Sequence, residues 1–236
     1  MVVEGGLARQ VLADQVKERL LEGILAGRYP PDSRIVETQV ARELGTSQAP
    51  VREALRGLEG LGFIEITPFR GARVRRPSRR DIVEAYTVRS TLEVLAARLA
   101  LPRLTVDDIA GLASVFETMQ RAAEADDGVA VAEADAAFHA RIVELADNAT
   151  LRRVWGSLEP LARTYLTLVT PGADARWSAA LHGPVLEAFR SGDTGAVVAA
   201  LERHFEDVRD HMARVWPEGD SGPGQSVVTG QTSTGR

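Results

Sequence analysis

The sequence predicts a mainly α-helical protein, with an N-terminal winged helix-turn-helix followed by an all-α antiparallel helical bundle. Apolar residues recur with helical spacing through most of the chain, and alternating, strand-like segments occur only near 63–75. Three predicted helices precede these strands, and this combination forms a winged helix-turn-helix. We expect domains at 1–77 and 78–216, followed by a tail at 217–236 whose Gly, Ser, Thr, Pro and Gln content predicts disorder.

In the first domain, apolar spacing predicts helices at 7–25, 37–44 and 47–61, and a glycine follows each of them. Ser47 is a favourable N-cap residue for the third helix. Strands are expected at 63–66 and 72–75, because short runs of alternating residues flank a turn at 68–71.

The remainder of the chain shows helical spacing and no strand pattern. Ser78 with Asp81, and Thr105 with Asp108, have the spacing of capping boxes at helix N-termini. Turn residues separate the segments, which predicts an antiparallel bundle. The helices are expected near 79–101, 106–126, 129–147, 150–169, 176–191 and 194–215.

Cysteine is absent from the 236 residues. Its absence excludes disulfides, thiolate metal sites and cysteine catalysis, and is typical of a cytoplasmic protein. No apolar run approaches the roughly 18 residues that a membrane span requires. Acidic residues among the first 25 positions argue against a signal peptide.

The net charge of −5 argues by itself against nucleic acid, but the charge is unevenly distributed. Residues 1–77 hold 12 basic and 10 acidic side chains, whereas the remainder holds 16 and 23. The segment 67–80 contains six arginines and no acidic residue. Arg70 and Arg73 of the predicted hairpin are therefore placed to meet phosphates or to enter a minor groove.

The third predicted helix has an apolar side and a polar side. Val51, Leu55 and Leu58 would face the core, and the side that would face a major groove presents Gln48, Ala49, Arg52 and Arg56. Arg reads guanine, and Gln reads adenine, through paired hydrogen bonds. The alternative is an ordinary solvated helix in which the arginines pair with Glu53 and Glu59. The arginine-rich hairpin favours the DNA-binding interpretation.

Asp135, His139, His182 and His204 each fall on the apolar stripe of a predicted helix. An unpaired polar group would be costly there. One carboxylate and three imidazoles are typical ligands of a divalent ion, with zinc favoured and nickel or manganese as alternatives. A hydrogen-bonded core cluster without metal is the other interpretation, and the number of such residues favours the metal.

Arg89 lies on the first bundle helix and has the geometry to bind a carboxylate effector in bidentate fashion. A salt bridge to Glu93 or Glu84 is an equally good interpretation. His211 is expected to be a bystander, because Asp210 and the nearby end of the chain suggest exposure. Asn148 is expected to cap a helix.

The segment 30–74 contains PVREAL, a following L-E-x-x-G and R-G-x-x-V. Together these motifs resemble the N-terminal domain of GntR-family transcription regulators. The helical part is similar to the effector domain of the FadR subfamily, usually called FCD. The similar segments are 88–100, 135–151, 181–193 and 200–208.

The resemblance implies a homodimer that binds a palindromic double-stranded DNA operator with an affinity altered by a small effector. It implies that Arg52 is the main contact of the recognition helix and that Gly71 lies at the wing tip, where a side chain would obstruct the minor groove. It also implies that the aspartate and three histidines bind a divalent ion. The family usually has Arg where this chain has Gln48, and Gln does not replace a bidentate Arg–guanine contact.

These observations predict a DNA-binding transcription regulator and not an enzyme, and the family favours a repressor of a metabolic operon. A small organic acid bound at the metal site would alter operator affinity. The alternatives are a metal-responsive regulator, or one with a structural ion and a non-carboxylate effector. A metal-dependent hydrolase is the remaining alternative, and it lacks an evident general base.

Overall fold

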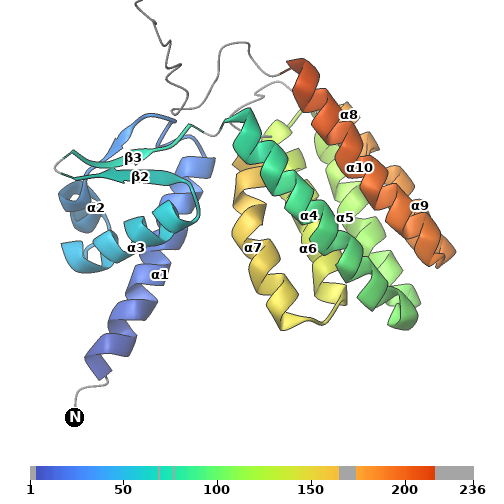
Figure 1. Ribbon diagram of the computed structural model, residues 1–236, viewed down its shortest axis with the longest axis horizontal. Helices are drawn as coiled ribbons and strands as arrows, with labels where there is room; N and C mark the ends of the chain where they lie inside the picture. The colour runs from blue at the N-terminus through green and yellow to red at the C-terminus, as the bar shows by residue number, and fades with distance from the viewer. Residues whose placement is uncertain (1–3, 69, 77, 165–173, 216–236) are drawn as a thin grey trace, which may run out of the picture.

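The computed structural model describes residues 4–68, 70–76, 78–164 and 174–215. The predicted tail at 217–236 and the end of the helix expected at 150–169 lie outside the described residues. Figure 1 shows a helical protein with one small sheet, which lies in the N-terminal part. The predicted order, a winged helix-turn-helix before an all-helical part, is confirmed.

The N-terminal part folds around its own apolar core. Its helices are α1 (Glu4–Leu25), α2 (Glu37–Glu43) and α3 (Gln48–Gly60), and its strands are β1 (Arg34–Ile35), β2 (Ile64–Thr67) and β3 (Gly71–Val74). The strands form an antiparallel sheet in the order β1-β3-β2. Helices and sheet bury a common cluster that includes Leu20, Leu55 and Val74. The sequence did not predict β1, because two residues are too few to show an alternating pattern.

The expected cap of α3 is only partly correct. Ser47 occupies the N-cap position with an extended backbone, but its side chain makes no capping hydrogen bond. An N-cap side chain accepts from the second or third backbone N–H of the helix. Pro50 occupies the third position of α3 and has no N–H, so one of the two usual donors for Ser47 is missing.

The helical part begins at α4, and its N-termini are capped as predicted. Both capping boxes form, between Ser78 and Asp81 and between Thr105 and Asp108. Asn148 accepts hydrogen bonds from two backbone N–H groups at the start of α7, which confirms its capping role. The helices are α4 (Arg79–Ala100), α5 (Val106–Glu124), α6 (Gly128–Leu145), α7 (Ala149–Thr164), α8 (Ala175–Ala180), α9 (Gly183–Ser191) and α10 (Thr194–Val215), with a 3-10 turn at Leu101–Arg103 after α4.

The single helix expected at 176–191 is wrong, because the structure has two helices, α8 and α9, in this range. Pro184 lies in the first turn of α9. A proline ring clashes with the carbonyl four residues earlier and removes one hydrogen bond, so a continuous helix is blocked near Ala180. His182 consequently lies at the N-cap of α9 instead of on a helical stripe.

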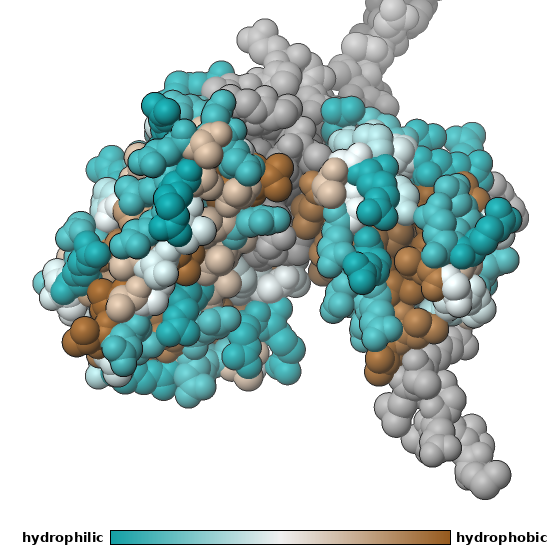
Figure 2. Space-filling model, turned by 180° about the vertical axis from the view of Figure 1, so that it is seen from behind, coloured by the Kyte–Doolittle hydropathy of each residue, from teal (hydrophilic) through white to brown (hydrophobic). Residues whose placement is uncertain are grey.

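α4 holds the helical part together, since it packs against α6, α7 and α10. Figure 1 shows these helices side by side. The face in Figure 2 is mostly hydrophilic, with hydrophobic surface in separate patches. Within the described residues, no helix is both long and apolar enough to cross a bilayer.

Candidate functional site

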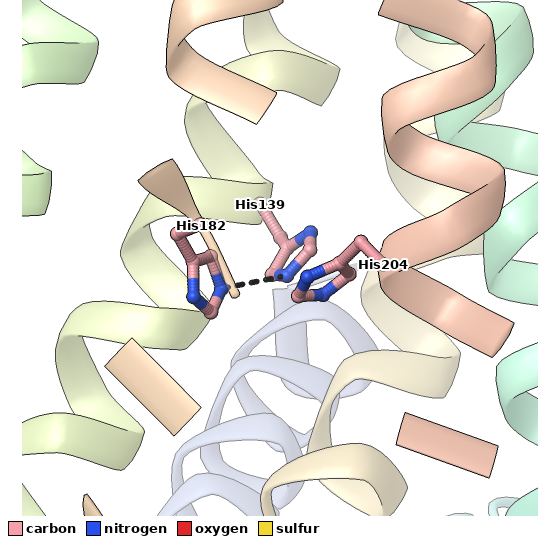
Figure 3. Close-up of side chains that lie close together, drawn as sticks. All are labelled: His139, His182 and His204. Atoms are coloured by element: carbon pink, nitrogen blue, oxygen red, sulfur yellow. Dashed lines mark hydrogen bonds between the residues drawn. The ribbon is translucent and has the colours of Figure 1, made fainter. Parts of the chain in front are cut away.

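Three histidines meet in the core of the helical part (Figure 3). His139 comes from α6, His182 from the junction of α8 and α9, and His204 from α10. All three are buried, and one ring nitrogen from each lies within 4.8 Å of the others. Asp135 lies one turn before His139 on α6 and is also buried. The structure thus brings the four residues of the predicted set together.

The hydrogen-bond partners of His139 and His182 identify the ring nitrogen that carries the proton when each ring is neutral. His139 Nδ1 lies 2.5 Å from Glu93 Oε2, and His182 Nδ1 lies 3.0 Å from the Ser178 carbonyl oxygen. A carboxylate and a carbonyl accept hydrogen bonds and do not donate them, so each Nδ1 carries the proton. In the neutral form of each ring Nε2 is then the nitrogen with the lone pair, and the two Nε2 atoms face each other across 3.3 Å.

Asp135 adds a carboxylate to these lone pairs. Its Oδ1 lies 3.1 Å from His182 Nε2 and 4.0 Å from His139 Nε2. Burial would raise the pKa of Asp135, but the His182 hydrogen bond, the neighbouring imidazoles and Arg89 outweigh burial and hold that pKa well below its usual range. The cluster therefore contains an ionised carboxylate.

His204 contributes a neutral imidazole. Burial, followed by the nearby His182 and His139, holds the pKa of His204 well below its ordinary value. Its Nδ1 is buried without a hydrogen-bond partner. A buried polar atom of this kind costs free energy unless something binds it.

The residues present fit a divalent cation. When His139 and His182 are neutral, their Nε2 lone pairs converge with one oxygen of Asp135, and the buried Nδ1 of His204 has no hydrogen-bond partner. Ligand atoms about 2.0–2.2 Å from zinc are roughly 3–3.5 Å apart. The 3.3 Å between the two Nε2 atoms and the 3.1 Å between His182 Nε2 and Asp135 Oδ1 match this spacing, whereas the 4.0 Å between Asp135 Oδ1 and His139 Nε2 is longer. These residues line a cavity of about 10 Å³, which holds one ion or water.

Glu93 also contacts the histidine cluster, through His139. From the sequence alone, Glu93 was expected only as a partner for Arg89. It is fully buried on α4 and accepts hydrogen bonds from His139, from Trp155 Nε1 at 2.7 Å, and from Arg89. Burial would raise the pKa of Glu93, but His139 and Arg89 outweigh burial and lower it. A signal existed in the sequence, because Tyr86, Arg89 and Glu93 have the i, i+3, i+7 spacing of one helical face.

Arg89 forms a salt bridge to Glu93, the alternative to effector binding, with Nη2 at 3.0 Å and Nε at 3.2 Å from Oε1. Its guanidinium also lies 5.4–5.7 Å from the ring centres of Tyr86, Trp155 and Phe205. Burial lowers the pKa of Arg89, but Glu93, Tyr86 and Asp135 outweigh this and raise it. Arg89 lines the same cavity as the histidines.

His211 stands apart from the histidine cluster. Its ring stacks on Trp177 with centres 4.0 Å apart, and Trp177 lines the cavity. Burial, with the nearby Arg214, lowers the pKa of His211. The ring is partly buried, so the exposure expected for His211 is incomplete.

The N-terminal part presents the predicted DNA-contacting residues as expected. Val51, Leu55 and Leu58 are buried, whereas Gln48, Arg52 and Arg56 are exposed and Ala49 is half-buried. Arg52 pairs with Glu37 of α2, with Nη2 and Nε 2.9 and 3.1 Å from Oε2. The sequence had offered Glu53 and Glu59 as partners. Glu59 instead accepts a hydrogen bond from Ile66 N–H.

The wing is the hairpin of β2 and β3. Arg70 and Arg73 are exposed on it, and Arg73 Nη1 donates to the carbonyl of Asp32 at 2.6 Å. Gly71 has a φ of +84°, so a residue with a Cβ would be strained there. The backbone therefore requires glycine at this position, independently of any contact with DNA.

Comparison with known proteins identifies both parts of the chain. Residues 12–74 match the gntR family of bacterial regulatory proteins, and residues 84–207 match the FCD domain. The probable D-xylose utilization operon transcriptional repressor of Paenarthrobacter nicotinovorans is 36% identical over 200 residues, covering 84% of this chain and 87% of the relative. The gluconate operon transcriptional repressor of Bacillus subtilis is 24% identical over 200 residues, with 82% of each chain covered.

Solved structures show the same fold. Escherichia coli McbR/YncC superposes with a TM-score of 0.70 at 24% identity, covering 86% of this chain and 97% of that one. A GntR regulator from Rhodococcus sp. RHA1 superposes with a TM-score of 0.74 at 21% identity, covering 87% and 99%. The chain therefore belongs to the gntR family of bacterial regulatory proteins, and is a DNA-binding transcription regulator, not an enzyme, that carries an FCD domain after its winged helix-turn-helix.

Proposed function

We propose that the chain represses a metabolic operon, and that a small carboxylate effector bound at a divalent-metal site in the FCD domain controls its affinity for the operator. The observation that carries the proposal is the convergence of a carboxylate and three imidazoles in the core of the domain joined to the winged helix-turn-helix. The names of the D-xylose and gluconate operon repressors support the repressor role.

Operator recognition is assigned to α3 and the wing. The exposed side chains of Gln48, Arg52 and Arg56, with Ala49 beside them, would contact base edges in a major groove. Arg70 and Arg73 would contact phosphates around Gly71. Glu37 holds the Arg52 guanidinium until a base or phosphate replaces it.

The ion would be held by Asp135, His139, His182 and His204, with zinc favoured over nickel or manganese. When bound, such an ion supplies a positive charge and open coordination positions that a carboxylate can occupy. Trp177, Tyr86 and Arg89 line the same cavity. We assign to Arg89 a long-range electrostatic attraction for the effector carboxylate, because its Nη2 and Nε already bind Glu93.

A homodimer on a palindromic operator is the assembly we propose. Val88, Leu95 and Leu99 are exposed apolar residues on α4, and Val154 is exposed on α7, the neighbouring helix. Exposed apolar side chains on adjoining helices are suited to contact a second copy. The same helix α4 is tied to the DNA-binding domain, because Asp81 pairs with Arg75 at 3.3 Å. A change in the FCD core would reach the winged domains through α4.

A second candidate is a regulator whose ion is structural or is itself the signal. The size of the cavity favours it, since about 10 Å³ holds an ion or a water but no organic acid without rearrangement. In this case the effector would be the metal alone or a ligand without a carboxylate.

Thermal unfolding across a panel of ligands tests the two candidates. We expect one small carboxylate, with gluconate and citrate among those tried, to raise the melting temperature of metal-loaded protein. A ligand at 100 times its Kd stabilises the folded state by about 2.7 kcal/mol. Chelation before the addition should abolish the shift. D-Xylose serves as the uncharged comparison.

His182→Ala is the matched variant for this experiment, because it removes one proposed ligand. It should bind less metal and lose the carboxylate response, whereas Arg203→Ala, an exposed change on α10, should keep both. A shift that survives chelation would place the effector away from the ion. No shift with any acid would favour the structural or sensing ion.

A further inference from the structure

Glu93 makes more contacts than its salt bridge to Arg89 requires, and one of them is with His139 of the histidine cluster. Its carboxylate is fully buried, and its two oxygens are divided between different partners. Oε2 faces His139 Nδ1 at 2.5 Å, and Oε1 accepts from Trp155 Nε1 at 2.7 Å and from Arg89 at 3.0 and 3.2 Å. Each of these partners approaches with an N–H group.

This division of partners fixes the orientation of the carboxylate. Trp155 and Arg89 have only donors to offer, and they hold Oε1 from two sides. Oε2 is then directed at His139. The Arg89 guanidinium supplies the positive charge that keeps a buried carboxylate ionised.

We propose that Glu93 is the positioning residue of the ion site: it holds His139 in the Nδ1–H tautomer and so directs the Nε2 lone pair at the ion. The proposal rests on the metal site described under the proposed function. Histidines that bind metals commonly donate their other N–H to a carboxylate, which sets the tautomer and raises the basicity of the ligand nitrogen. Arg89 and Trp155 act on the ion site indirectly, because they hold the Glu93 carboxylate in place.

The network also links the ion site to α7, through His139 and Glu93. Trp155 belongs to α7, and α7 packs against α4 and contacts α1 of the DNA-binding domain. A change in the charge on His139 passes through one carboxylate to the Trp155 indole. The Trp155 Nε1–H resonance therefore reports on the ion site without any added label.

The tautomer is measured on the metal-free wild-type protein by long-range 1H–15N correlation of the histidine rings. We expect His139 to show a protonated Nδ1 and an unprotonated Nε2. His139→Asn assigns the signals, and Trp155→Phe assigns the indole. The opposite tautomer for His139 would overturn the proposal, whether or not the protein binds metal.

Glu93→Gln gives the sharper test, because glutamine has the same shape but one acceptor oxygen. Trp155 and Arg89 hold that oxygen at the Oε1 position, so the amide NH₂ meets His139 Nδ1. An NH₂ group donates, which makes Nδ1 an acceptor and moves the ring proton to Nε2. We expect the His139 tautomer to reverse and zinc affinity, measured by chelator competition, to fall about 10–100-fold.

Glu84→Gln is the control, since Glu84 is an exposed residue of α4 that pairs with Arg80. It should change neither the tautomer nor the zinc affinity. If Glu93→Gln fails to fold because Arg89 loses its counter-ion, Arg89→Met combined with Glu93→Gln removes both charges and keeps the Trp155 contact. Unchanged tautomer and zinc affinity in a folded Glu93→Gln variant would overturn the proposal. Wild-type protein that binds no divalent metal would instead overturn the proposed ion site, and the tautomer would still decide the role of Glu93.

Discussion

Individual side chains in this protein have defined roles because their hydrogen-bond partners leave few alternatives. The Ser178 carbonyl accepts only, so His182 has to donate from Nδ1 and present Nε2 to the cluster. Glu93 does the same for His139. The direction of both lone pairs thus follows from the chemistry of two neighbours.

Arg52 is the residue whose replacement should affect DNA binding most directly. Arg52→Ala should weaken binding to an operator selected from a random-sequence library by about 1–3 kcal/mol, or roughly 5–150-fold. The side chain is exposed, so circular dichroism should show unchanged helical content. Electrophoretic mobility shift at fixed salt provides the measurement.

Arg203→Ala, on the exposed side of α10, controls for the loss of one positive charge. It should bind the operator as the wild type does. If Arg52→Ala kept full operator affinity, α3 would not be the recognition helix in the manner we propose.

At the scale of helices and strands, short polar signals set the boundaries. The capping boxes at α4 and α5 form where the sequence places them, because the donors and acceptors lie within three residues of each other. The break between α8 and α9 also has a local cause in Pro184. The apolar residues on both sides of the break keep helical spacing, and this spacing predicted one continuous helix despite Pro184.

Asp81 gives a prediction on stability and its dependence on pH. Burial would raise the pKa of Asp81, but hydrogen bonds from the Ser78 backbone and side chain, and the charge of Arg75, outweigh burial and lower it. Asp81→Ala should lower the free energy of unfolding by about 1 kcal/mol at pH 7, and the melting temperature by about 2–4 °C. The measurement is thermal unfolding followed by circular dichroism.

The sign of the pH effect follows from the lowered pKa. The contribution of Asp81 is fully present above its unfolded pKa, about 3.9, and is lost as the pH falls through the lower folded pKa. The difference between wild type and variant should therefore shrink in acid. Asp107→Ala, an exposed acidic residue in the first turn of α5, is the control. An Asp81→Ala effect no larger than that of Asp107→Ala would contradict the capping role.

On the scale of the whole molecule, the DNA-binding part and the helical part have separate apolar cores. The buried cluster of the first lies entirely within 16–74, and those of the second within 82–212. The connection between them includes the pair of Arg75 and Asp81 and the contact of α1 with α7. A regulator needs such an arrangement, because the two parts have to keep their shape while their relative placement changes.

Fragment 1–77 tests this independence. We expect it to fold alone, because its core needs no residue from the helical part and domains of about 60 residues commonly fold unaided. It should be a monomer, since the proposed dimer contacts lie in the FCD domain. We therefore expect it to bind DNA weakly, mainly through phosphate contacts. Dispersed amide resonances and circular dichroism would check folding, and an unfolded fragment would show that α7 supports α1.

Local patterns in the sequence determined the order and type of most elements, the caps of α4, α5 and α7, and the four residues of the candidate ion site. Spacing along one helix predicts a shared face, so the four-residue interval between Asp135 and His139 is enough to pair them. Two features were not predicted from the sequence. The β1 strand is too short to show an alternating pattern, and the α8–α9 break lies within a continuous helical pattern of apolar residues.

Only the tertiary structure decided how those residues are connected. Glu93 and Trp155 are 62 residues apart in the chain, and nothing in their spacing predicts the hydrogen bond between them. The same holds for Arg52, whose partner Glu37 lies 15 residues away on another helix. Periodicity determines which face of a helix a residue occupies, whereas the packing of helices distant in the chain determines what that face meets. That packing brings one ring nitrogen from each of three buried histidines within 4.8 Å of the others.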